Sequence, residues 1–187
     1  MAFLPKIVEA GLRPVGAFAR SRVGGAATEF ALVAPIFIAL IFGTAQTAII
    51  YLANANLETA AEETARMVLT NNATTTSSNQ TAPMTAAQFQ TALCNNITAL
   101  FNCSNIMIGL APATSTTSIS TAAPTFNANG TLANTLPYTL PTPGQIAVLQ
   151  VLYQWPVIGL PLGFNFANLG NGTYLMMSTQ VFIVEAQ

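Results

Sequence analysis

The sequence predicts an α+β protein, in which one long N-terminal transmembrane helix continues into a small domain with a second helix and an antiparallel sheet. Three observations lead to this prediction. Residues 30–52 form an apolar run without a charged side chain, residues 53–69 continue it with amphipathic helical spacing, and two strand-like runs lie near the end of the chain. We expect a basic leader (1–24), the long helix (25–69) and an extracytoplasmic α+β domain (70–187).

The apolar run is long enough to cross a bilayer. As a helix it spans about 34 Å, against roughly 30 Å of hydrocarbon. A cleaved secretory signal usually has an apolar core of only about 7–15 residues, so we expect an anchor that stays on the mature protein. Basic residues before the run indicate a cytoplasmic N-terminus and an external domain in a single-pass protein. These residues are Lys6, Arg13, Arg20 and Arg22.

One carboxylate, Glu29, stands directly before the apolar run. The positive end of the helix dipole favours an anion at this position, so Glu29 needs no further role to be tolerated there. That reading does not account for the pair Gly24 and Gly25, five and four residues earlier. A functional interpretation therefore has to explain Gly24, Gly25 and Glu29 together.

The pattern of Gly24, four residues, Glu29 and the aromatic Phe30, followed by Ala-Leu-Val-Ala-Pro and a long apolar run, resembles a known processing site. It is similar to the prepilin site of the TadE-like family, the minor pilins or pseudopilins of tight-adherence (Tad) pilus systems. The resemblance implies that a prepilin peptidase cuts between Gly24 and Gly25, which makes Glu29 the fifth residue of the mature protein. It also implies an inner-membrane assembly platform with its ATPase, and other pilin subunits, as partners. Where a second acid is expected in the membrane segment, this chain has Gln46.

Physical chemistry favours the same mapping. A cut after Gly24 removes the basic leader and creates a free amine at Gly25, about one helical turn from Glu29. An unpaired carboxylate in apolar surroundings costs several kcal/mol, and an ammonium group on a neighbouring subunit offsets much of that cost. We therefore expect Glu29 to set the register of an assembly. The alternative is an unprocessed single-pass anchor protein whose external domain binds a ligand or a partner.

Composition argues against an enzyme. The chain has no His and no Asp, which excludes Ser-His-Asp, Cys-His and His-based metal sites, so we expect no cofactor, no metal and no small-molecule substrate. After processing, Arg66 is the one basic residue, too little charge for a nucleic-acid interface. A structural protein is the class that remains.

Beyond the membrane, residues 53–69 place small apolar side chains on one helix face and charges on the other. The apolar face is expected to carry the external domain, and it consists of Leu57, Ala60, Ala61, Ala65 and Val68. The polar tract 74–81 is expected to be a loop. Thr85 is predicted to cap a second helix that reaches about Phe101, with an apolar stripe at Phe89, Leu93, Ile97 and Leu100.

Cys94 and Cys103 lie near the end of that second helix. Outside an energy-transducing membrane, two cysteines this close favour a disulfide. Two buried thiols remain an alternative, and a metal site lacks further ligands.

The rest of the chain is expected to form strands and one long loop. Residues 105–110 and 145–155 read as strands, residues 111–143 as a loop with room for one short hairpin, and residues 173–184 as the last strand. The last two strands should pair antiparallel on the amphipathic helix. Between them, residues 157–162 are an apolar excursion, for which core filling, a subunit contact and a membrane-surface patch all remain open.

Overall fold

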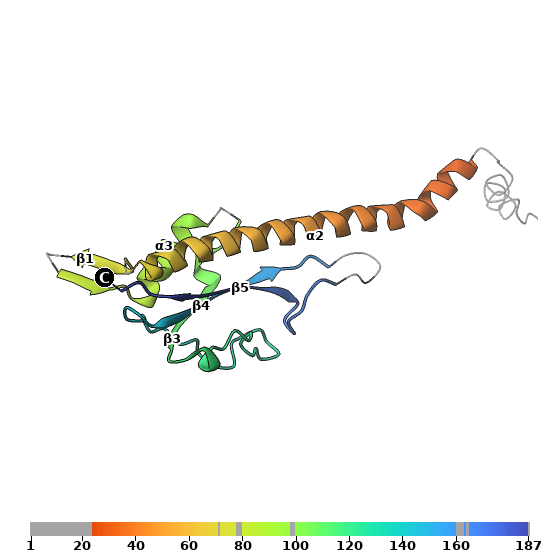
Figure 1. Cartoon of the computed structure of the whole chain (residues 1–187). Helices are drawn as coiled ribbons and strands as arrows, with labels where there is room; N and C mark the ends of the chain where they lie inside the picture. The colour runs from red at the N-terminus through yellow and green to blue at the C-terminus, as the bar shows by residue number, and fades with distance from the viewer. Residues whose placement is uncertain are drawn as a thin grey trace, which may run out of the picture.

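The computed structural model describes residues 24–70, 72–77, 80–97, 100–159, 163 and 165–186. Apart from Gly24, the expected leader lies outside these residues. The longest element is helix α2 (Gly25–Leu69), whose 45 residues extend over about 68 Å. Figure 1 shows that only the C-terminal part of α2 lies against the rest of the protein, while its N-terminal part projects away from it.

The projecting end of α2 is bent away from the axis of the rest of the helix (Figure 1). Pro35 lies inside the helix and has no backbone N–H, so the hydrogen bond that would close its turn cannot form. Proline is a common cause of such bends. A proline inside the helix is thus the feature of the sequence that accounts for the bend.

A three-stranded antiparallel sheet forms the body of the domain, with β4 (Ile146–Pro156) between β3 (Ile106–Ala113) and β5 (Thr173–Ile183). In its register, Leu149 lies opposite Leu110 on one side and Gln180 on the other. The predicted pairing of the last two strands is confirmed. Strand β3 extends three residues beyond its predicted end, because an edge strand tolerates a proline, here Pro112.

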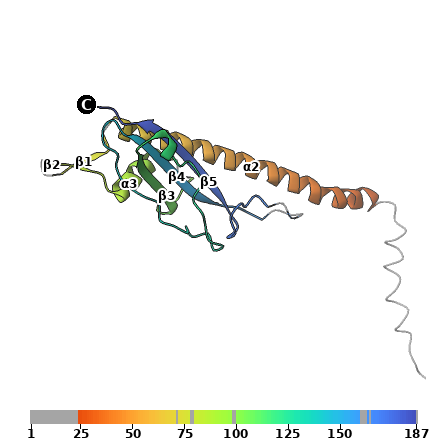
Figure 2. The same cartoon turned by 60° about the horizontal axis from the view of Figure 1, so that its bottom comes forward.

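The core lies between α2 and one face of this sheet (Figures 1 and 2). All five residues of the predicted apolar helix face are buried, and the charged residues on the opposite side are exposed. Alanines on this face bring the helix backbone close to β4 and β5, where Leu149 and Val151 are fully buried. The backbone N–H of Glu185 donates to the carbonyl of Leu69 at 2.8 Å, which ties the end of the chain to the end of α2.

The opposite face of the sheet is covered by the connection between β3 and β4. Leu152 points to this face and is fully buried. Leu110 accepts a hydrogen bond from Thr139 at 2.7 Å and donates one to Pro137 at 2.8 Å, so the connection also covers part of the β3 edge. The connection contains a short 3-10 turn, η3 (Thr116–Ser118), and one antiparallel bridge between Phe126 and Leu132. The expected long loop with a single short hairpin is confirmed.

The polar tract after α2 was predicted to be a loop, and this prediction is wrong. In place of a loop, it forms a two-stranded antiparallel hairpin of β1 (Thr74–Ser77) and β2 (Gln80–Pro83). Polarity suggested a loop, but threonine is β-branched and favours extended backbone, which the pairing of the two strands uses. The polar composition of this tract therefore did not predict its strands.

The second helix is α3 (Ala86–Asn96), shorter than expected by five residues. Thr85 caps it as predicted, since its hydroxyl accepts from the N–H of Gln88 while the Gln88 side chain accepts from the N–H of Thr85. Phe89 and Leu93 are fully buried, whereas Leu100 lies outside the helix and is exposed. The helix ends early because the chain becomes extended at Ile97 and returns to the short turn η2 (Cys103–Asn105).

Candidate functional site

The candidate site is the part of α2 that the domain leaves mostly uncovered, residues 25–49, hereafter the uncovered segment. Ala39 is the one buried residue in this range, with 1% of its surface exposed. Large apolar side chains are exposed all around the uncovered segment, including Phe30, Leu32, Val33, Ile36, Phe37, Leu40, Ile41, Phe42 and Ile49. A helix that is apolar on every side is typical of a membrane span, whereas the core helix of a soluble protein would be buried. Within the described part of the chain, α2 is the one helix long and apolar enough to cross a membrane. The structure is therefore consistent with a single-pass anchor.

The expected processing residues lie together at the start of this segment. Gly24 precedes the first residue of α2, Gly25, and a Cβ added to either glycine would meet no atom of the described residues within 4 Å. The Thr28 hydroxyl donates to the carbonyl of Gly25 at 2.8 Å, a hydrogen bond within the first turn that threonine commonly makes in helices. The Gly24–Gly25 bond is thus open to approach from outside.

Glu29 lies in the second turn of α2 and is exposed, as is the adjacent Phe30. Among the described residues, no basic group lies within ion-pair distance of its carboxylate. Gly24, Gly25, Glu29 and Phe30 therefore lie together at one end of the helix. None of the described residues is a charge partner for Glu29.

Gln46 makes a contact that the sequence did not predict. Its two terminal amide atoms lie 3.2 and 3.1 Å from the backbone oxygen and nitrogen of Ile158, in the connection between β4 and β5. With the amide nitrogen assigned to the side facing the carbonyl, Gln46 donates to Ile158 and accepts from it at the same time. The signal for this role was a single glutamine in an otherwise apolar run. Its partner could not be identified from the sequence.

Next to this contact, α2 and Phe166 border an apolar groove of about 550 Å³. The helix side of the groove consists of Ala39, Leu40, Gly43, Thr44, Thr47, Ala48 and Tyr51. Both threonine hydroxyls are occupied, since Thr44 donates to Leu40 and Ile41, and Thr47 donates to Gly43. The wall therefore presents apolar surface and internally bonded hydroxyls.

Cys94 and Cys103 are joined in the structure, with their Cα atoms 5.9 Å apart. This bond connects the last turn of α3 to η2 across a separation of nine residues. The Gln90 side chain reinforces the same junction, because its amide donates to the carbonyls of Cys103 at 2.7 Å and Ile106 at 2.9 Å. The pair lies in the domain that follows α2, far along the chain from the expected processing residues.

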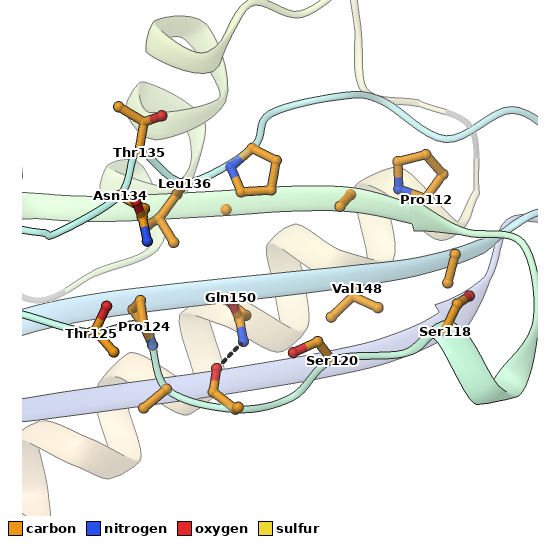
Figure 3. A pocket seen from close by; sticks show the side chains of 16 residues that line it. Pro112, Ser118, Ser120, Pro124, Thr125, Asn134, Thr135, Leu136, Val148 and Gln150 are labelled. Carbon is orange, nitrogen blue, oxygen red and sulfur yellow. Dashed lines mark hydrogen bonds between the residues drawn. The ribbon is translucent and has the colours of Figure 1, made fainter.

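A second hollow, of about 420 Å³, lies on the sheet face opposite α2, beneath the β3–β4 connection (Figure 3). Hydroxyls, amides, prolines and aliphatic groups line it, and none of its lining residues is ionisable. Gln150 points from β4 into the hollow and donates to the carbonyl of Ala122 at 3.1 Å. Across the described residues, no group of three potential metal ligands occurs. The hollow offers polar contacts and no group for acid–base or metal chemistry.

Comparison with known proteins places the similarity in α2. The family model described as TadE-like protein matches residues 24–66. No curated protein and no solved structure matches the chain. The matched segment begins at Gly24, includes Glu29 and Phe30, and ends three residues before α2 does. The match over residues 24–66 thus confirms the resemblance to the TadE-like family that the pattern at Gly24, Glu29 and Phe30 predicted.

Proposed function

We propose that this chain is a structural minor pilin or pseudopilin of a Tad-type pilus, processed by a prepilin peptidase and acting in pilus assembly or initiation. The observation that carries the proposal is that three features begin at the same place in the chain. The family match begins at Gly24, α2 begins at Gly25, and these two residues are the expected cleavage pair. The family describes subunits of this kind, and the external domain of this chain is larger than a short filament-forming subunit would need.

Processing would occur at the peptide bond between Gly24 and Gly25. The open space around both glycines supports access by a peptidase. Removal of the leader eliminates Lys6, Arg13, Arg20 and Arg22, which would otherwise hold the N-terminus at the cytoplasmic surface. The processed subunit then retains an uncovered apolar helix that can move from lipid into a packed filament.

Glu29 would act during assembly. Its carboxylate lies about 6 Å along the helix axis from the new amine at Gly25. Within a bundle of such helices, the amine of one subunit can pair with the carboxylate of the next, because neither charge is stable alone in apolar surroundings. The lack of a charge partner among the described residues of this chain supports an intermolecular role.

The partners follow from these steps. They are the prepilin peptidase, an inner-membrane platform with its assembly ATPase, and other pilin subunits, including those of the filament body. The subunit would insert with its N-terminus in the cytoplasm and its domain outside, and would remain in the membrane until it is extracted into a pilus.

Glu29→Gln tests this function directly, because it removes the charge and keeps the shape. We expect normal protein levels in the membrane and a loss of at least about tenfold in the protein recovered with sheared surface filaments, since an unpaired buried charge costs several kcal/mol. The matched control is Glu58→Gln, which removes an exposed carboxylate on the packed part of the same helix and should leave assembly unchanged.

Unchanged recovery of Glu29→Gln with filaments would contradict the assembly role of the carboxylate. Together with a retained leader, that result would favour the static anchor with a binding domain. In that case the hollow of Figure 3 becomes the place to search for a ligand.

A further inference from the structure

We propose that the two described ends of the connection between β4 and β5 dock into the outer leaflet of the lipid bilayer beside α2, and that Gln46 fixes the depth of Ile158. The surface is defined by the described ends of this connection, residues 157–159 and 165–169. The inference depends on α2 spanning the membrane, which is part of the proposed function. It assigns a partner, hydrocarbon and headgroup of the outer leaflet, to a surface that the assembly role leaves unexplained.

The first argument is position. A membrane span takes about 20 helical residues, so a span that begins between Gly25 and Phe30 ends between about Thr44 and Ile49. Ile158 binds α2 at Gln46, and Phe166 borders the same groove as residues from Ala39 to Tyr51. Ile158 and Phe166 therefore lie at the level where α2 leaves the hydrocarbon. Figures 1 and 2 show β4 and β5 directed along α2 toward its projecting half.

The second argument is the polar backbone of the connection. Lipid offers no hydrogen-bonding partner, so backbone groups at this depth must be satisfied by the protein. Gln46 satisfies both the N–H and the carbonyl of Ile158. The side chain of Asn165 accepts from the N–H of Ala167 at 2.9 Å.

The same pattern continues to the start of β5. The side chain of Asn168 accepts from the N–H of Leu175 at 2.7 Å. The backbone N–H groups of Asn168 and Leu169 both donate to the carbonyl of Thr173, at 3.2 and 3.1 Å. Internal turns of this kind also occur at Asn102 and Asn129, in loops away from α2, whereas the two hydrogen bonds to the Ile158 backbone come from α2 itself, through Gln46.

The third argument is the surface itself. The sequence between Arg66 and Glu185 contains no charged side chain, so the connection can enter the headgroup layer without burying a charge. Ile158 is 75% exposed, so core filling does not account for it. The groove beside it is apolar, and its threonine hydroxyls already donate within the helix. Tyr51 lies just beyond, with an amphipathic ring suited to the headgroup layer.

A second copy of the chain could cover the same surface in a filament, but the position of the connection favours lipid. Before assembly, α2 crosses the bilayer alone, and any loop held beside residues 39–51 meets lipid at once. Docking there would also orient the external domain on the membrane, since the α2 helix and the connection provide two separate points of contact.

Depth-dependent fluorescence quenching tests the proposal in the full chain. The single tryptophan, Trp155, is replaced by Phe, and one new tryptophan is introduced at Ile158, Phe37 or Thr117. Each variant is reconstituted into phosphatidylcholine vesicles whose acyl chains are brominated either close to the headgroup or close to the chain ends. Phe37 lies in the uncovered segment, and Thr117 lies in η3, at the end of the sheet away from the connection.

We expect Ile158→Trp to be quenched most by bromine near the headgroup, Phe37→Trp most by bromine deeper in the chains, and Thr117→Trp by neither. Adding Gln46→Leu should reduce the quenching of Ile158→Trp at least about twofold and leave Phe37→Trp unchanged, because the backbone of Ile158 then loses its partner. Circular dichroism of each variant verifies that the domain is folded.

Quenching of Phe37→Trp without quenching of Ile158→Trp would overturn the proposal and leave the pilin-like function intact. Unquenched tryptophan at both positions would refute the membrane span itself, and the proposed function with it. If Gln46→Leu left Ile158→Trp fully quenched, the assignment of depth control to Gln46 would be wrong.

Discussion

Two halves of one helix meet different surroundings. The uncovered segment, residues 25–49, exposes phenylalanine, leucine and isoleucine on all sides, whereas the packed segment, residues 50–69, buries four alanines and four larger side chains on one face. The more hydrophobic half is thus the half that the protein does not bury. Large apolar side chains around a whole helix suit a fluid environment, while a narrow face of small residues suits close packing on a sheet.

The difference shows that hydrophobicity alone does not locate a core. Ala53, Ala60 and Ala61 are completely buried, although each contributes little apolar area. Their value is that they bring the helix backbone close to β4 and β5. In contrast, Phe30 is 73% exposed, and its apolar area can be covered only by something outside the described chain, either lipid or another subunit.

The largest expected effect comes from a pair of leucines on the two halves. Leu57 is 1% exposed, so Leu57→Ala should destabilise the domain by about 2–5 kcal/mol through lost burial and a cavity. Leu40 is 56% exposed, so the matched variant Leu40→Ala should change stability by less than about 0.5 kcal/mol. Denaturant unfolding in detergent measures both. Equal losses in the two variants would contradict the division of α2 into an uncovered and a packed segment.

Removal of the disulfide should give the next largest loss of stability, and this loss should be confined to the domain that packs on residues 50–69. Closing a loop of this length contributes about 2.5–3 kcal/mol, so Cys94→Ser with Cys103→Ser should destabilise the domain by that amount. Membrane insertion of the uncovered segment should be unaffected, as measured by carbonate extraction. Treating the wild-type protein with reductant should reproduce the loss. Two alkylatable thiols in unreduced protein from the cell envelope would show that the bond does not form there.

The smallest effect concerns Tyr138, which packs on α3 through Phe89, with ring centroids 5.9 Å apart, and donates to the Met84 carbonyl at 3.1 Å. Burial raises the pKa of Tyr138 from 10.0 to about 12. A raised folded-state pKa means that its contribution to stability is complete below about pH 10 and is lost as the pH rises toward about 12.

Tyr138→Phe should cost about 0.5–1.5 kcal/mol at neutral pH and should flatten the fall in stability above about pH 10. Denaturant midpoints at several alkaline pH values provide the measurement. Tyr51→Phe is the matched control, since the ring of Tyr51 is exposed on α2. An alkaline fall that is as steep in Tyr138→Phe as in the wild type would remove this role from Tyr138.

Much of the fold could be predicted from periodicity. The 3.6-residue spacing of Leu57, Ala61, Ala65 and Val68 identified the packed face of α2, and the Thr85–Gln88 capping box identified the start of α3. Both signals are local, because the residues that form them are close in sequence. The hairpin β1–β2 was missed, because its strands are short, polar and paired only with each other.

The candidate site divides in the same way. Gly24, Gly25, Glu29 and Phe30 lie within seven residues, so a sequence motif could identify them. The contact between Gln46 and Ile158 joins residues more than a hundred positions apart, and only the tertiary structure brings them together. Gln46 could be noticed as a polar residue in an apolar run, but nothing in the local sequence identifies the backbone that it binds.

The most direct test of the central claim is the N-terminal residue of the protein extracted from membranes of cells with an active prepilin peptidase. Intact mass should give a chain that begins at Gly25, and Gly24→Leu should restore the full leader. Gly16→Leu, at a leader glycine away from the cut, should be processed normally. A wild-type chain that still begins at Met1 would contradict the pilin-like account and leave a static anchor with an external domain.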